Sequence, residues 1–214
     1  FYAYADTLKE AERVFVHDLT STLQVIARDA KIQVDFNPAV VSRYRLIGYE
    51  NRMLAAEDFN DDTKDAGEIG AGHTVTALYE LVPVGVEFNE RGVDPLRYQP
   101  QPEPAPMVEA VSDDLFLLKI RHKKPDEDVS TKLEFPIEDT GRKYQQASGD
   151  FQFAAAVAGF GMMLRHSPYK GGISLEQVLA LAENGLGEDK HGYRKEFFEL
   201  VKQTRKIARQ RQRH

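Results

Sequence analysis

Ala30-Lys31-Ile32-Gln33-Val34-Asp35-Phe36-Asn37-Pro38 is the stretch of sequence that decides the fold class. Its apolar residues Ile32, Val34 and Phe36 alternate with polar ones, which is the pattern of a strand with one face in water. The Asn-Pro pair that follows is a turn signal and ends the strand. The chain is therefore expected to build a sheet from this segment outward.

Further segments carry the same period of two, so that five or six strands can be counted. Short strands joined by turn residues, without helices between them, are typical of an antiparallel sandwich. We therefore expect residues 30–140 to form a β-sandwich. Its further strands are expected at residues 43–46, 73–84, 115–121 and 133–137.

Helical spacing of apolar residues appears on both sides of this region. Near the start, Asp6 or Thr7 can cap a helix, and Thr20 or Ser21 can cap a second short one that carries Leu23, Ile26 and Ala27. After the sandwich, residues 148–212 are predicted to form a helical subdomain packed on it. Its first helix, 151–166, is apolar on nearly all sides and is expected to be buried; a helix capped by Ser174 and Gln177 and a helix starting near Tyr193 follow. The predicted fold class is α+β, an antiparallel β-sandwich followed by a C-terminal helical subdomain.

Composition limits the classes of function. The 214 residues carry a formal net charge of −6, which argues against a general nucleic-acid binder. There is no cysteine, which excludes disulfides, thiolate zinc sites and cysteine nucleophiles. No apolar run reaches the about 20 residues that span a bilayer, so no direct membrane insertion is expected. The first residue is Phe1, and we interpret the chain as a fragment of a longer protein.

No catalytic motif is found, since the six histidines lack the HExxH spacing and no serine lies in G-x-S-x-G. The strongest candidate site is the acidic loop, residues 57–68, which packs six carboxylates around one lysine. Asp58, Asn60 and Asp62 reproduce the D-x-N-x-D start of a calcium loop, whose alternating oxygens can wrap a hard cation. The later positions depart from that motif, because Thr63 replaces its glycine and Ile69 its glutamate.

Two interpretations of the acidic loop remain open. It is either a Ca²⁺ site built on Asp58, Asn60 and Asp62, or a solvated connector between two strands whose Asp and Asn residues cap turns. Two other segments are also ambiguous. Gln99–Pro106 reads QPQPEPAP, which suits a surface crossover or an extended docking strip for an aromatic groove. The basic last helix suits a solvated helix end or contact with an anionic membrane or RNA.

Residues 44–52, the acidic loop and residues 65–80 together resemble the C-terminal region of bacterial YfbK-like proteins that carry a von Willebrand factor type A domain. Residues 93–98 and 151–164 fit the same region. The resemblance implies that residues 1–29 are the terminal strand and helix of the type A domain, with the strand at 1–5 and the helix at 6–19. It also implies a bacterial cell envelope or periplasmic location, although a cytoplasmic one stays open.

The family's C-terminal domain has no assigned function, so the resemblance supplies none. We expect a non-enzymatic protein-interaction or scaffold module, without catalytic residues or a cofactor, C-terminal to a type A domain. Its expected partners are the preceding type A domain of the same chain and an unknown protein ligand, and not nucleic acid. The alternative is a metal-dependent enzyme or adhesion site that uses the acidic loop with Ca²⁺.

Overall fold

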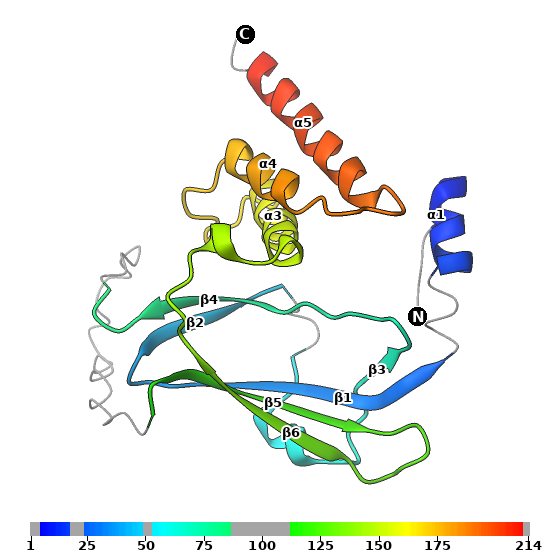
Figure 1. The fold of residues 1–214 in the computed structure, drawn as a ribbon, viewed down its shortest axis with the longest axis vertical. Coiled ribbons are helices and arrows are strands. Elements are labelled where there is room, and N and C mark those ends of the chain that lie inside the picture. The colour runs from blue at the N-terminus through cyan, green and yellow to red at the C-terminus, as the bar shows by residue number, and fades with distance from the viewer. Residues whose placement is uncertain (1–4, 18–23, 49–52, 87–111, 212–214) are drawn as a thin grey trace, which may run out of the picture. The chain divides into compact units, whose positions relative to one another are not determined.

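The computed structural model describes residues 5–17, 24–48, 53–86 and 112–211 (Figure 1). The chain divides into two compact units, Phe1–Asp139 and Thr140–His214. The first unit holds all the described strands and the second holds the three long helices.

The first unit contains two antiparallel sheets. The larger has the strand order β3-β1-β5-β6, and the smaller pairs β2 with β4. This arrangement confirms the α+β class and the antiparallel pairing predicted from the alternating sequence. The bounds are β1 Val25–Phe36, β2 Val41–Ile47, β3 Gly67–Gly70, β4 Leu78–Pro83, β5 Asp114–Lys123 and β6 Thr131–Glu138.

The register of the larger sheet separates an apolar face from a polar face. Ile32 of β1 lies opposite Ile120 of β5, which lies opposite Leu133 of β6. Because side chains alternate along a strand, every second residue from these positions shares the apolar face. Lys31 lies opposite Arg121 on the other face, which therefore carries the charged side chains of β1 and β5.

Aromatic rings join the two sheets at the end of β1. The Phe36 ring stacks on Tyr44 of β2, with centroids 4.2 Å apart, and meets Tyr79 of β4 edge-on at 5.4 Å. The same ring contacts Phe116 of β5 at 5.5 Å. Offset and edge-on ring pairs stabilise beyond the area they bury, so this cluster fastens the smaller sheet to the larger one.

The second unit is a three-helix arrangement of α3 (Gly149–Leu164), α4 (Leu175–Asn184) and α5 (Tyr193–Arg211). The short 3-10 turn η4 (Tyr144–Gln146) precedes them. Ser174 and Gln177 form the predicted capping box at the start of α4. The core is built from side chains of all three helices: Ala156, Phe160, Val178, Leu179, Ala182 and Val201.

Glycines let the helices approach closely at two points. A Cβ added to Gly159 would lie 2.4 Å from Ile173 Cδ1, and one added to Gly185 would lie 2.6 Å from the Gly149 carbonyl oxygen. The expectation that α3 is buried holds for one part of its surface, which includes Ala156 and Phe160, whereas Val157 and Leu164 are 43% and 59% exposed.

A helix near the start of the chain is present, as predicted, but its α-helical part is only five residues long. Thr7 caps α1 (Leu8–Glu12) by accepting a hydrogen bond from the Glu10 amide, and a π-helical turn, η1 (Arg13–His17), continues it. The predicted second helix is wrong at Ile26 and Ala27, which lie in β1.

Other boundaries also differ from prediction. The strand expected to start at residue 73 starts at Leu78, and β3 was not predicted as a strand. In α5, Val201 is fully buried, whereas Leu200 and Ile207 are half-exposed. The predicted strand at residues 1–5 and the proline-rich stretch at 99–106 fall mainly or wholly outside the described residues.

Candidate functional site

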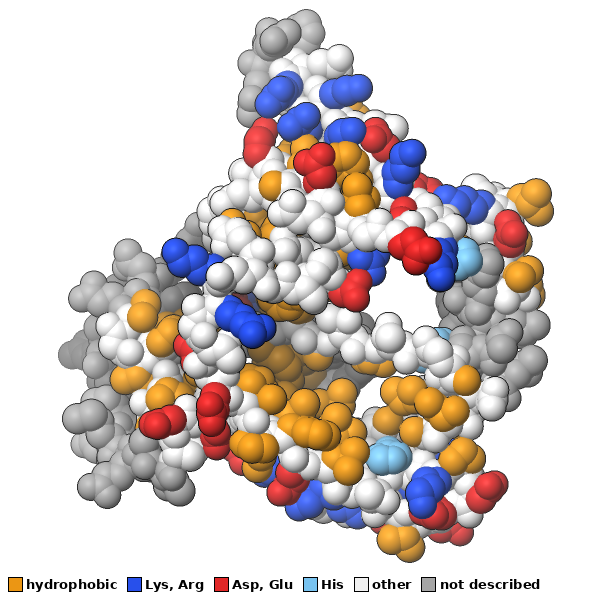
Figure 2. Space-filling view, viewed as in Figure 1, with side chains coloured by type: hydrophobic (Ala, Val, Ile, Leu, Met, Phe, Trp, Pro, Cys, Tyr) orange, Lys and Arg blue, Asp and Glu red, His pale blue; other side chains and the backbone are white. Residues whose placement is uncertain are grey.

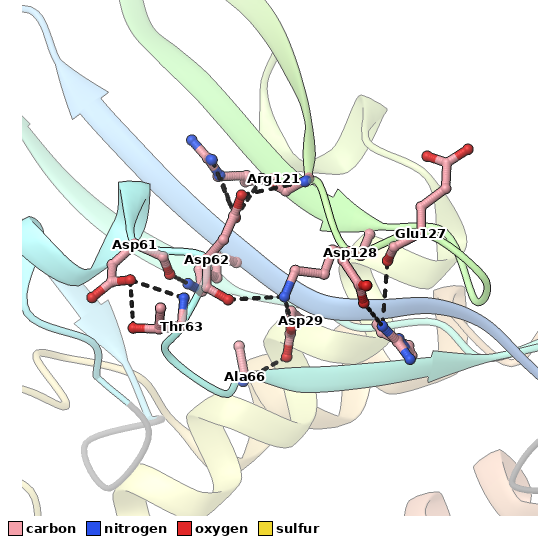
Figure 3. A network of polar contacts seen from close by, with 12 residues as sticks. Asp29, Asp61, Asp62, Thr63, Ala66, Arg121, Glu127 and Asp128 are labelled. Atoms are coloured by element: carbon pink, nitrogen blue, oxygen red, sulfur yellow. Dashed lines mark hydrogen bonds and ion pairs between the residues drawn. The ribbon is translucent and has the colours of Figure 1, made fainter.

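The acidic loop is an ordered turn that lies over the polar face of the larger sheet (Figure 3). It begins with the 3-10 turn η3 (Ala56–Asn60), in which Phe59 is buried at 4% exposure. Asp61 then folds the chain back, since its Oδ1 accepts hydrogen bonds from the Thr63 amide at 2.8 Å and the Thr63 hydroxyl at 2.7 Å. Asp at such a turn stabilises it through its own side chain.

Lys31 of β1 supplies the first cation beneath the loop. It is only 5% exposed, and its ammonium donates to the carbonyl oxygens of Asp58, at 3.2 Å, and Asp61. A buried ammonium requires such acceptors, because leaving it unpaired is costly. The loop therefore wraps its backbone oxygens around an ammonium group that belongs to the chain itself.

Lys123 of β5 supplies the second cation. Its ammonium donates to Asp29 Oδ2 at 2.6 Å and to the Asp62 carbonyl oxygen at 2.9 Å (Figure 3). Asp29 also accepts from the Ala66 amide at 3.2 Å, so it joins β1, β5 and the end of the loop. Its backbone lies in the left-handed region, with φ of 51°, where Asp and Asn are among the better tolerated residues.

Arg121 supplies the third cation and binds side chains instead of carbonyls. It donates to Asp62 Oδ1 at 3.1 Å and to Asn60 Oδ1 at 3.2 Å. Ser130 adds a hydroxyl that donates to Asp62 Oδ1 at 2.6 Å. The carboxylate of Asp62 is thus held by groups from both sides of the turn between β5 and β6.

The strands place these three cations on one face for a simple reason. Lys31 and Arg121 are opposite one another in the ladder, and Lys123 is two residues beyond Arg121 on the same strand. Side chains two apart on a strand point to the same side of the sheet. The acidic loop therefore meets a basic surface, and opposite charges attract it to that surface.

Hydrogen-bonding and charged partners lower the pKa values of three carboxyl groups in and beside the loop. The Lys123 ammonium beside Asp29 holds the pKa of that carboxyl below its usual value, against the opposing effect of burial. The Ser130 hydroxyl is the main cause of a lowered pKa at Asp62, with Arg121 contributing. The Thr63 hydroxyl and amide lower the pKa of Asp61. All three carboxyls are therefore stabilised in the ionised form.

The structure gives each residue of the predicted calcium set a protein partner. Asp58 Oδ1 lies 3.6 Å from the Lys64 ammonium, and both Asn60 and Asp62 accept from Arg121. Within the described ranges, no group of three or more His, Asp or Glu side chains is arranged to hold a metal ion. The calcium site stays a prediction, and the geometry directs these oxygens toward the chain's own cations.

Sequence reasoning missed the residues beneath the loop: Lys31, Arg121, Lys123, Asp29 and Ser130. A partial signal existed, because the polar positions of β1 and β5 carry several Lys and Arg residues. The strand register was needed to bring them together.

The helical unit contains a pocket of about 620 Å³. It offers amide and phenol groups with apolar side chains and has no charged residue in its lining: Tyr144, Gln145, Gly172, Ile173, Gln177, Ala180, Leu181 and Asn184. The lining therefore contains no pair of groups suited to acid–base catalysis at neutral pH.

Comparison with known proteins places the chain in a family. Residues 21–207 match the family described as "Uncharacterized protein YfbK, C-terminal". The chain belongs to this family. A relative in Escherichia coli (strain K12), "Uncharacterized protein YfbK", is 42% identical over 200 residues, which are 94% of this chain and 33% of the relative. The predicted resemblance to the C-terminal region of YfbK-like proteins is confirmed. The chain spans about a third of the length of that relative.

No solved structure matches the chain. Among the residues that the structure describes, no helix has both the length and the apolar character needed to cross a membrane.

Proposed function

We propose that this YfbK-type C-terminal domain is a non-enzymatic interaction module of the bacterial envelope. Residues 5–17 belong to the terminal helix of a preceding type A domain and pack on the rest of that domain, and the sheets and helices after them act as a scaffold. Two observations support this role: the chain belongs to the YfbK C-terminal family, and α1 and η1 expose apolar side chains.

The exposure of these side chains is the observation that carries the proposal. Leu8 is 88% exposed, Phe15 65% and Val16 60%. Leu8 begins α1, and Phe15 and Val16 lie in the π-helical turn that continues it. The segment is nevertheless well formed, with the Thr7 cap and an ion pair between Arg13 and Glu10. An ordered helical segment with uncovered apolar side chains is typical of an interface.

The family match supports a covering domain on the N-terminal side. The match begins at residue 21, after α1 and η1, and the family is described as C-terminal in its longer relative. Two-thirds of that relative lies outside the region this chain covers. The resemblance to type A proteins supplies the kind of domain that would contact Leu8, Phe15 and Val16.

The state of the charged groups supports a non-enzymatic role. In the acidic loop, Asp62 is held by Arg121 and Ser130, while Asp29 is held by Lys123. A general acid or base usually needs a pKa near its working pH, whereas the lowered pKa values of Asp29 and Asp62 favour the ionised form at neutral pH. These contacts serve to fasten a loop.

The test compares the Leu8→Ser/Phe15→Ser variant in two contexts. One is this chain, and the other is this chain preceded by the residues that precede the matching region in the Escherichia coli relative. In the chain alone, we expect the double substitution to change the free energy of unfolding by less than about 0.5 kcal/mol, because both side chains are exposed. We expect the longer protein to lose several degrees of Tm as the interface is weakened.

The matched control is Val129→Ser, which removes an apolar side chain that is 75% exposed elsewhere in the same unit. It should leave both proteins unchanged. Equal effects of the Leu8→Ser/Phe15→Ser change in the two contexts would overturn the proposed contact.

A further inference from the structure

The last turns of α5 are strongly basic in a chain that is acidic overall. Residues 202–211 contain five Lys and Arg residues and no Asp or Glu, whereas the whole chain has a net charge of −6. Figure 2 shows Lys and Arg side chains gathered toward the free end of α5, at the top of the view. The described part of α5 therefore ends in a concentrated positive charge.

The same part of the helix exposes apolar side chains. Leu200 and Ile207 are 51% and 53% exposed, while Val201 is fully buried in the helical core. The intervals of seven and four residues place Leu200, Ile207 and Arg211 on one side of the helix. That side lies away from Val201, so α5 has a core-facing side and a separate solvent-facing apolar stripe.

Two of the cations beside this stripe are available for a partner. Lys202 pairs with Glu199 at 2.8 Å, and Arg209 reaches Glu176 of α4 at 3.3 Å. Lys206 and Arg211 make no ion pair within 4 Å among the described residues, although Lys206 helps at longer range to lower the pKa of Glu199. Lys206 directly precedes Ile207 and Arg211 follows it by one helical turn, so positive charge lies on both sides of the exposed isoleucine.

We propose that the C-terminal half of α5 docks on a surface of anionic lipid headgroups. Lys206 and Arg211 would contact headgroup phosphates, and Leu200 and Ile207 would enter the boundary between headgroups and acyl chains. An amphipathic helix that combines basic and exposed apolar side chains binds membrane surfaces in this way. Such peripheral contact needs no spanning helix.

Charge complementarity and the apolar stripe together favour this partner over nucleic acid. A nucleic-acid backbone attracts cations without needing exposed aliphatic side chains. The cations also complement the negative end of the helix dipole, but that effect leaves the exposure of Leu200 and Ile207 without a role. A lipid surface uses both features.

The test is co-sedimentation of the full chain with vesicles of phosphatidylglycerol and phosphatidylcholine in equal parts. Each Lys or Arg near an anionic surface strengthens binding about fivefold. We therefore expect Lys206→Gln/Arg211→Gln to lower the vesicle partition coefficient about 25-fold. Ile207→Gln should weaken binding as well, and pure phosphatidylcholine vesicles should bind weakly.

The matched control is Lys190→Gln/Lys195→Gln, which removes the same charge from the region around the start of α5. Control binding close to that of the unchanged chain supports the proposal. Equal losses in the two double variants would overturn it, since net charge alone would then explain the binding. The proposal would also be overturned if the chain did not bind anionic vesicles. If it then bound double-stranded RNA, and the Lys206→Gln/Arg211→Gln variant did not, the basic end of α5 would be a nucleic-acid surface instead.

Discussion

Lys123 and Asp29 form an ion pair that fastens the acidic loop to the larger sheet. The ammonium lies 2.6 Å from Asp29 Oδ2, and the two side chains are only 9% and 17% exposed. Lys123 also donates to the loop carbonyl of Asp62, and Asp29 accepts from the Ala66 amide. This one ion pair therefore holds both ends of the loop segment 62–66, through the Asp62 carbonyl oxygen and the Ala66 amide.

Replacing Asp29 by Asn tests how much this pair stabilises the fold. Asn retains an oxygen for the Ala66 amide and tolerates the positive φ, but it removes the charge that faces Lys123. We expect a loss of about 1–2 kcal/mol in the free energy of unfolding, below that of a fully buried pair because Asp29 keeps some solvent contact. Urea denaturation of this first unit measures it.

Asp29→Ala is the companion variant. It also removes the acceptor of the Ala66 amide and places a less tolerant residue at positive φ, so it should destabilise the unit more than Asp29→Asn does. Equal stabilities of Asp29→Asn and the unchanged chain would contradict the role assigned to the pair.

Acid should weaken the first unit through the same carboxyl groups. The folded pKa values of Asp29 and Asp62 lie below the ordinary value of 3.8. Their contribution is therefore complete above that pH and is lost as the pH falls through the folded values, since the unfolded chain takes up protons first. Denaturation curves between neutral pH and pH about 3 should show this decline.

The Asp29→Asn/Asp62→Asn variant should have a shallower dependence on pH in that range, because two of the titrating groups are gone. A slope identical to that of the unchanged chain would show that other carboxyls control the acid response.

Two glycines of the helical unit should respond in opposite ways to alanine. A Cβ at Gly185 would meet the Gly149 carbonyl oxygen at 2.6 Å and the Phe153 amide nitrogen at 2.8 Å, whereas one at Gly161 would meet nothing within 4 Å. Gly185→Ala should therefore cost about 1–3 kcal/mol through overpacking. Gly161→Ala should stabilise α3 by about 0.5–1 kcal/mol. Thermal unfolding of both variants gives the comparison, and similar Tm values would refute the close approach at Gly185.

Calorimetric titration with Ca²⁺ tests the alternative function of the acidic loop. Because Asn60 and Asp62 accept hydrogen bonds from Arg121, and Asp58 faces Lys64, we expect millimolar Ca²⁺ to give neither binding heat nor a thermal shift. The control is Asp58→Ala/Asp62→Ala. Heat in the unchanged chain that disappears in this variant would establish a calcium site and favour a metal-dependent role.

Local pattern was enough to predict most of the sheet. Alternation identified β1, β2, β5 and β6, and the turn at Asn37 ended β1 where it was expected. It missed β3, because Gly67–Gly70 is a four-residue strand with glycine at both ends. Ile26 and Ala27 suited helical spacing, but pairing of this part of β1 with β3 makes them strand residues.

Only the acidic loop of the candidate site could be predicted from the sequence. The acidic loop is visible as a run of carboxylates, but its partners are distant in sequence. Lys31 and Arg121 lie 27 and 59 residues from their loop contacts at Asp58 and Asp62. Such pairs depend on the antiparallel register of β1 and β5, which local periodicity does not specify.

Hydrogen exchange of residues 5–17 is the most direct test of the central claim that this domain is joined to a preceding domain through α1 and η1. It should be measured in this chain and in the longer protein that includes the residues preceding the matching region of the relative. In the chain alone, where Leu8, Phe15 and Val16 are exposed, we predict fast exchange of the backbone amides of residues 5–17. In the longer protein, we predict that the same amides exchange at least about tenfold more slowly, since covered helices open less often. Equal exchange rates for residues 5–17 in the two proteins would contradict the account.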